Sequence, residues 1–150
     1  MEEIIIRNGT ADDVDAVMDL VHELALYEKA PHEVTHTAAQ MRLDGFGDRP
    51  LFNLLVAEHA GVVVGMALCY VRYSTWKGAM TYLEDFYVQE PYRGQGIGHR
   101  LFEQCVKQAK ADGMAGICWQ VLDWNEPALN FYRKYNAMLD PEWINGKILF

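Results

Sequence analysis

The spacing of apolar and polar residues changes several times along this chain, and each change predicts a new element. Residues 3–7 form a short β-rich run, and Thr10 then provides the N-cap of a helix that extends to about Glu28. Apolar residues recur in that helix at steps of three and four, which is typical of one buried helix face. A second helix is predicted from Thr37, where a capping box begins, to the glycines at 45 and 47.

The middle of the chain is rich in residues that favour strands. Three β-rich runs follow one another, and the short turn at 59–61 joins the first two as a hairpin, so we expect an antiparallel meander of residues 51–58, 62–73 and 79–88. A glycine cluster at 94–98 then precedes an amphipathic helix that ends at Gly113.

The last part of the chain is expected to add a strand at 116–122, a helix that begins at Glu126 and Pro127, and a final strand in the apolar run 147–150. No repeat, linker or low-complexity tract divides the sequence. We therefore expect a single domain over residues 1–150, of the α/β (α+β) class.

Composition and charge narrow the kind of protein. The chain has 150 residues, of which 51% are hydrophobic and 23% charged, which is ordinary for a globular domain. Its formal net charge of −8 argues against nucleic acid as a partner and favours a cation. The apolar stretch 62–71 is far shorter than the roughly 20 residues of a membrane-spanning helix, and the first residues are acidic, unlike a signal peptide. We expect a soluble protein with no membrane partner.

The three cysteines, Cys69, Cys105 and Cys118, are odd in number and include no Cys-x-x-Cys pair. Neither a disulfide framework nor a thiolate zinc site is indicated, so a reducing, cytoplasmic compartment is expected. Residues 32–36 match His-Glu-x-x-His, the zinc metalloprotease pattern, which requires both histidines on one continuous helix. Pro31 precedes the motif and the next helix starts at Thr37, so both histidines are expected in a loop and no metal is predicted.

The stretch from Tyr82 to Gly98 is a strand that runs into glycines at the start of a helix. Such a loop can bind an anion, because backbone N–H groups converge there without Cβ interference and the helix adds partial positive charge. Gly98 is followed by His99 and Arg100. These residues match neither a Walker loop, which ends in Gly-Lys-Ser/Thr, nor the dinucleotide fingerprint, which requires Gly or Ala at position 99.

The remaining pattern, Arg-x-x-Gly-x-Gly at Arg93, Gly96 and Gly98, resembles the pyrophosphate loop of the GNAT superfamily of acyl-CoA-dependent N-acyltransferases. The order of the expected elements is also similar to that family over essentially the whole chain. More specifically, the chain is similar to the diamine (spermidine/spermine) acetyltransferases and their thialysine-acetylating relatives in segments 23–28, 44–47, 55–58, 82–86 and 124–132.

This resemblance implies a mixed, strongly twisted sheet with flanking helices and acetyl-CoA in a gap between the strand that ends at Val88 and the strand at 116–122. It also implies a homodimer. The residues implied to contact the cofactor are Phe86, Tyr87, Val88, Arg93, Gly94, Gln95, Gly96, Ile97, Gly98, Asn125, Glu126, Pro127 and Ala128.

Acetyl transfer from a thioester to an amine requires a proton acceptor for the amine and a proton donor for the leaving thiolate. The resemblance implies that Tyr132 is the donor and that Glu84 binds the amine and acts as base, directly or through water. Asp85 is adjacent, and the alternation of a regular strand would place it on the opposite face from Glu84, which rules out a carboxylate dyad. Tyr27, Glu28 and Glu142 match positions that bind a polyamine chain. With Glu84 and Asp85, they are the residues expected to bind the substrate.

The sequence thus predicts an acetyl-CoA-dependent N-acetyltransferase that acts on a small cationic amine, such as a polyamine, diamine or thialysine-like amino acid. A protein amine or an aminoglycoside as acceptor is an alternative. A noncatalytic acyl-CoA-binding module is another, although such a module has no need of Tyr132 or Glu84.

Overall fold

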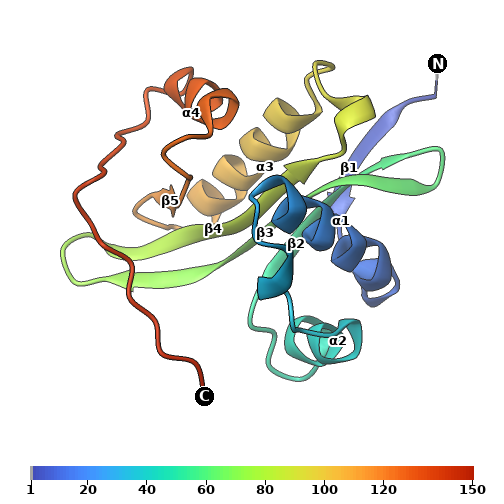
Figure 1. Ribbon diagram of the computed structural model, residues 1–150, viewed down its shortest axis with the longest axis horizontal. Helices are drawn as coiled ribbons and strands as arrows, with labels where there is room; N and C mark the ends of the chain where they lie inside the picture. The colour runs from blue at the N-terminus through green and yellow to red at the C-terminus, as the bar shows by residue number, and fades with distance from the viewer. Residues whose placement is uncertain (1) are drawn as a thin grey trace. The chain divides into compact units, whose positions relative to one another are not determined.

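A mixed sheet of five strands, in the order β1-β2-β3-β4-β5, is the centre of the fold in the computed structural model, which describes residues 2–150 (Figure 1). The strands are β1 (Ile4–Asn8), β2 (Asn53–His59), β3 (Val62–Ser74), β4 (Gly78–Val88) and β5 (Ile117–Trp119). The helices are α1 (Val14–Tyr27), α2 (Ala38–Phe46), α3 (Ile97–Ala111) and α4 (Glu126–Arg133), with short 3-10 turns at Ala11–Asp13, Pro31–Glu33 and Glu90–Tyr92.

The predicted meander is confirmed. The pairs β1–β2, β2–β3 and β3–β4 are antiparallel, whereas β5 joins β4 in parallel. The turn between β2 and β3 has only Ala60 and Gly61 between the paired residues His59 and Val62, and both have positive φ, +53° and +78°. Two left-handed residues in succession are the signature of a type I′ hairpin turn, which matches the twist of the flanking strands.

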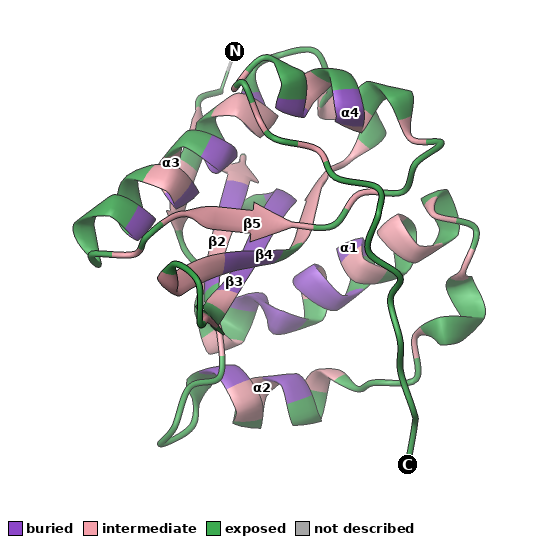
Figure 2. Cartoon of the chain, turned by 90° about the vertical axis from the view of Figure 1, so that its left-hand side faces the viewer, coloured by how far each residue is buried: buried purple, intermediate pink, exposed green. Residues whose placement is uncertain are grey.

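Helices cover both faces of the sheet. Val17 and Leu20 of α1 pack with Val56 and Met66 of the sheet, and Met41 of α2 joins the same cluster. On the opposite face, Ile97 and Leu101 of α3 pack with Ala57 and Val64. Figure 2 shows buried segments along β3 and β4 and on α1 and α3. The sheet therefore has an α1 face and an α3 face.

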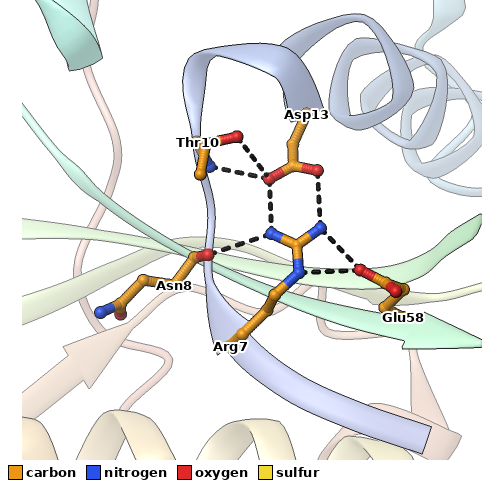
Figure 3. Close-up of polar contacts among 5 residues, drawn as sticks. All are labelled: Arg7, Asn8, Thr10, Asp13 and Glu58. Atoms are coloured by element: carbon orange, nitrogen blue, oxygen red, sulfur yellow. Dashed lines mark hydrogen bonds and ion pairs between the residues drawn. The ribbon is translucent and has the colours of Figure 1, made fainter. Parts of the chain in front are cut away.

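The start of α1 is fixed by an ion-pair network (Figure 3). Arg7 donates two hydrogen bonds to the buried carboxylate of Asp13, at 2.7 and 2.9 Å, and its Nε donates to Glu58 at 2.8 Å. The Thr10 backbone N–H also donates to Asp13, at 2.7 Å. The network joins β1, β2 and the turn before α1, so it sets where that helix leaves the sheet.

The structured chain forms two compact units, the first extending to Trp119 and the second comprising Gln120–Phe150. In the first unit, β5 is shorter than the strand expected at 116–122. In the second, helix α4 forms as predicted, but the final strand expected at 147–150 is wrong. Ile148 and Leu149 are 84% and 77% exposed, and a strand forms only where its backbone pairs with another strand.

All three cysteines are free thiols. Cys69 on β3 and Cys105 on α3 are buried with their Sγ atoms 3.9 Å apart, although 36 positions separate them in sequence. No helix within residues 2–150 has both the length and the apolar character needed to cross a membrane.

Candidate active site

The glycine loop lies between the end of β4 and the start of α3. Gly94 and Gly96 have φ of +76° and +79°, values that side-chain-bearing residues rarely adopt, and Gly96 is the N-cap of α3. A Cβ atom built on either glycine would meet no other atom of residues 2–150 within 4 Å, apart from its chain neighbours, so it would point into open space above the loop. The loop thus keeps clear the space in front of the helix N-terminus, as an anion such as a pyrophosphate requires.

Arg93 makes its contacts with other residues of the protein. Its backbone N–H donates to the Glu90 carbonyl at 3.1 Å and its Nε donates to the Val88 carbonyl at 2.9 Å. Its guanidinium carbon lies 5.4 Å from the Tyr27 ring centre and 5.3 Å from that of Tyr87. These are cation–π distances, so Arg93 connects the glycine loop to the end of β4 and to the last residue of α1.

Strand β4 has β5 beside it for only part of its length. The parallel ladder comprises Thr81, Tyr82 and Leu83 of β4, paired with Ile117, Cys118 and Trp119. Within the first unit, residues 84–88 therefore have a strand neighbour on the β3 side alone. The segment includes residues 86–88, for which the resemblance implied contacts with the cofactor. On its α3 face, Phe86 packs edge to face with Phe102, whose ring also contacts Trp119.

Glu84 is the extra residue of a β-bulge. Leu83 pairs with Cys69 and Asp85 pairs with the preceding residue Leu68, which leaves Glu84 without a partner of its own on β3. Asp85 shares the α1 face with Leu68, and the Glu84 carboxylate lies 3.5 Å from the Tyr70 hydroxyl on the same face. The expectation that the two carboxylates point to opposite faces is therefore wrong, because the bulge interrupts the alternation of the strand.

A third acid completes this carboxylate cluster, which we define as Glu28, Glu84 and Asp85. Burial raises the pKa of Asp85 to about 6, and the charges of Glu84 and Glu28 act in the same direction. Burial also raises the pKa of Glu28, the residue that caps the C-terminus of α1. Repulsion among the three carboxylates and the poor solvation of the partly buried ones both favour a bound cation at this cluster.

Next to the cluster, two tyrosines and an arginine extend the same face toward the end of the β3–β4 hairpin. The rings of Tyr70 and Tyr82 lie 5.2 Å apart, and the Arg72 guanidinium lies 5.4 Å from the Tyr82 ring. Burial, followed by the charge of Glu84, raises the pKa of Tyr82 to about 12, so its hydroxyl stays protonated at neutral pH. Sequence analysis did not identify these three residues as part of the site. The available signal was the period-two spacing of Tyr70 with Arg72 and of Tyr82 with Glu84, which places each pair on one face of a strand.

In the second unit, Asn125 caps α4, its side-chain oxygen accepting from the Ala128 backbone N–H at 3.3 Å, with Pro127 in the first turn. Tyr132 is 6% exposed and packs edge to face against Phe131, with ring centres 5.4 Å apart. Glu142 is exposed, and its backbone N–H donates to Asp140.

The His-Glu-x-x-His pattern does not form a helix. His32 lies in the 3-10 turn Pro31–Glu33, and His36 directly precedes Thr37, the N-cap of α2. Each histidine has a separate acidic neighbour, Glu33 at 3.7 Å and Asp44 at 3.5 Å. The prediction that both histidines lie in a loop is confirmed.

A mixed sheet with a glycine loop that opens a helix, and with strand backbone and carboxylates beside it, defines a scaffold for acyl transfer. Residues 16–137 match the acetyltransferase (GNAT) family, and the chain belongs to that family. It is therefore an N-acetyltransferase, in a family that takes its acetyl group from acetyl-CoA.

Curated relatives and a protein of solved structure are also named as acetyltransferases. The chain is 40% identical over 140 residues to the thialysine N-epsilon-acetyltransferase of Mus musculus, covering 88% of this chain and 82% of that protein. It is 34% identical over 145 residues to the spermidine/spermine N(1)-acetyltransferase-like protein 1 of Homo sapiens, covering 92% of this chain and 21% of that longer protein. An aminoglycoside acetyltransferase from a soil metagenome has the same fold, with a TM-score of 0.79, 17% identity and coverage of 98% and 96%.

Proposed function

We propose that this enzyme transfers the acetyl group of acetyl-CoA to a primary amine of a small cationic acceptor, such as a polyamine, a diamine or a thialysine-like amino acid. The carboxylate cluster of Glu28, Glu84 and Asp85 carries the proposal, because two partly buried acids beside a third, exposed one are best satisfied by a cation. Relatives named for thialysine and for spermidine/spermine acetylation support the same class of acceptor.

We assign the pyrophosphate of acetyl-CoA to the glycine loop and its pantetheine to β4. The N–H groups of Gly94, Gln95, Gly96, Ile97 and Gly98 would hold the pyrophosphate, and the open space in front of Gly94 and Gly96 fits that assignment. Residues 86–88 would pair with the pantetheine, since their β5 side has no partner in the first unit. Asn125, Glu126, Pro127 and Ala128, at the start of α4, are proposed further contacts. When bound, acetyl-CoA supplies the thioester that the amine attacks.

The acceptor amine must lose a proton before it attacks, and its reference pKa is about 10.4. Glu84 is the proposed base, directly or through water, and Asp85 is a second candidate on the same face. Asp85 has a pKa of about 6, closer to neutral pH than an ordinary aspartate, which suits it to accept a proton there. Tyr132 is the proposed acid that protonates the departing thiolate, and Tyr27 and Glu142 are proposed contacts of the acceptor chain.

We further propose that the enzyme is a cytoplasmic homodimer. The free thiols are compatible with a reducing compartment, and the dimer follows from the resemblance to the diamine acetyltransferases. Light scattering coupled to size-exclusion chromatography measures the mass, and a monomer at micromolar concentration would contradict the dimer.

The decisive experiment is a thiol-release assay with acetyl-CoA and a panel of amines. Spermidine, 1,3-diaminopropane, lysine and thialysine represent cationic acceptors, and a neutral hydrophobic amine of similar size is the control. We expect turnover of cationic acceptors with a KM that rises with salt, because screening weakens attraction to the cluster. Binding of CoA by calorimetry without turnover of any amine would identify a binding module instead. Preference for the neutral amine would refute the proposed acceptor class.

A further inference from the structure

Four residues of the β3–β4 hairpin share the α1 face of the sheet. Tyr70 pairs with Tyr82, and Arg72 follows Tyr70 by two positions, so these three side chains lie on one face. The bulge adds Glu84 to the same face, next to Tyr70. Figure 1 shows the hairpin extending beyond α1, and Arg72 is exposed to solvent there.

The Arg72 guanidinium is held in place without a carboxylate partner. It lies 5.4 Å from the ring centre of Tyr82, which is itself buried and packed against Tyr70. Burial raises the pKa of the Cys118 thiol, whereas the charge of Arg72 and a hydrogen bond from its side chain lower it, which places the guanidinium against β5 as well. No ion pair joins Arg72 to any acid within residues 2–150.

This arrangement differs from that of three other arginines in the chain. Arg7, Arg42 and Arg133 each have a carboxylate within 3.3 Å. Arg72 is instead held over a tyrosine ring, as Arg93 is, but the Arg93 Nε donates to the Val88 carbonyl beside the glycine loop, whereas Arg72 lies on the hairpin next to the tyrosines and Glu84. Its planar donors suit a carboxylate, which it can bind with two parallel hydrogen bonds.

The spacing of these groups indicates which carboxylate would fit. The Arg72 guanidinium lies 5.4 Å from the centre of the Tyr82 ring, the Tyr82 and Tyr70 rings lie 5.2 Å apart, and the Tyr70 hydroxyl lies 3.5 Å from the Glu84 carboxylate. The guanidinium and the carboxylate thus both border the same pair of rings, so one small acceptor can extend from one charge to the other. In lysine, ornithine or thialysine, the side-chain amine and the carboxylate carbon are separated by about five or six bonds, an extended span of about 6 to 8 Å. A diamine offers the amine but no group for Arg72.

We propose that Arg72 binds the α-carboxylate of an amino acid acceptor whose side-chain amine lies at Glu84 and Asp85, so that a lysine-like amino acid is preferred over the diamine of equal length. The inference rests on the proposed function and deepens it. Arg72 is then the residue that determines specificity, whereas the carboxylate cluster binds the amine that both kinds of acceptor share.

The test compares acceptors that differ only in the carboxylate: lysine with 1,5-diaminopentane, ornithine with 1,4-diaminobutane, and thialysine with its decarboxylated amine. The wild type should have the higher kcat/KM for each amino acid. In Arg72→Gln, kcat/KM for the amino acids should fall about 10- to 100-fold, mainly through KM, as expected for loss of a charge-assisted pair. Values for the diamines should stay within about twofold.

Lys77→Gln is the matched control, because Lys77 is exposed on the turn of the same hairpin and its backbone, not its side chain, bonds to Ser74. It removes the same charge and should leave every ratio of amino acid to diamine unchanged. Lysine amide is the matched ligand control. It should lose the wild-type advantage and be insensitive to Arg72→Gln.

Equal kcat/KM for each amino acid and its diamine in the wild type would overturn the inference and leave the proposed function intact. So would an equal loss of that ratio in Lys77→Gln, which would indicate general attraction of charge. Failure of the wild type to acetylate either kind of acceptor would refute the proposed function itself, and this inference with it.

Discussion

Asp85→Asn should make the enzyme more stable and less active. The pKa of Asp85 rises from its ordinary 3.8 to about 6, chiefly because the carboxyl is buried and also because Glu84 and Glu28 are near. A raised carboxyl pKa means that the folded protein binds the proton more tightly than the unfolded chain does. The free energy of unfolding therefore falls as pH rises from about 4 to about 6, and the whole penalty is present above that range.

The size of the penalty follows from the pKa. A shift of about 2 pKa units corresponds to about 3 kcal/mol, since one unit is about 1.4 kcal/mol. Asparagine has nearly the same shape and no charge, so it should remove this penalty. We expect Asp85→Asn to unfold at a higher urea concentration than the wild type at about pH 8, and at nearly the same concentration at about pH 4.

Urea unfolding followed by circular dichroism at these two pH values measures the effect, and kcat/KM for the best acceptor should fall in the same variant. Glu84→Gln is the control, because Glu84 is exposed and its loss should lower the pKa of Asp85 only in part. A stability difference between Asp85→Asn and the wild type that is the same at both pH values would refute the reasoning, since only an ionising carboxyl produces the dependence.

Three further variants test other parts of the molecule. Asp13→Ala should destabilise the protein by about 2 kcal/mol at neutral pH and by less in acid, because Arg7 holds the pKa of Asp13 below its ordinary value; equal loss at low pH in urea titrations would contradict this. Gly96→Val should weaken CoA binding at least tenfold by calorimetry, because φ is +79° and the side chain fills the space over the loop; unchanged affinity would remove the loop from the site. Tyr132→Phe should lower kcat by about 10² to 10⁴ with CoA affinity retained, and an unchanged kcat in an assay limited by chemistry would exclude Tyr132 as the acid.

Local patterns were sufficient for most elements. The capping residue Thr37, the period-two runs and the glycines at 94 and 96 act within a few residues of themselves, so α2, the meander and the loop were predictable. Thr10 caps the 3-10 turn Ala11–Asp13, and α1 itself begins after Asp13, three residues later than Thr10 predicted. The wrong predictions concerned segments whose structure depends on residues far away in the sequence. The apolar run at 147–150 looks like a strand, but its outcome depends on whether another strand is available to pair with it.

The site was predictable by residue type and less so by geometry. Glu84 and Asp85 were identified from their motif, but the bulge that places them on one face arises from the pairing of β4 with β3, and nothing in the residues 82–86 reveals it. Arg72 was missed for the same reason, since its position over Tyr82 depends on the register between two strands. Register is a property of two segments together.

The bulge at Glu84 also makes the site sensitive to insertions and deletions as distinct from substitutions. A regular strand offers one side chain to each face about every 7 Å, whereas the bulge provides two carboxylates at a single step of the ladder. Glu84→Gln would change one charge and leave the backbone as it is. Removal of Glu84 would instead give an uninterrupted ladder with Asp85 still opposite Leu68. The deletion of one residue would therefore make the sheet more regular and remove one carboxylate from the proposed amine site.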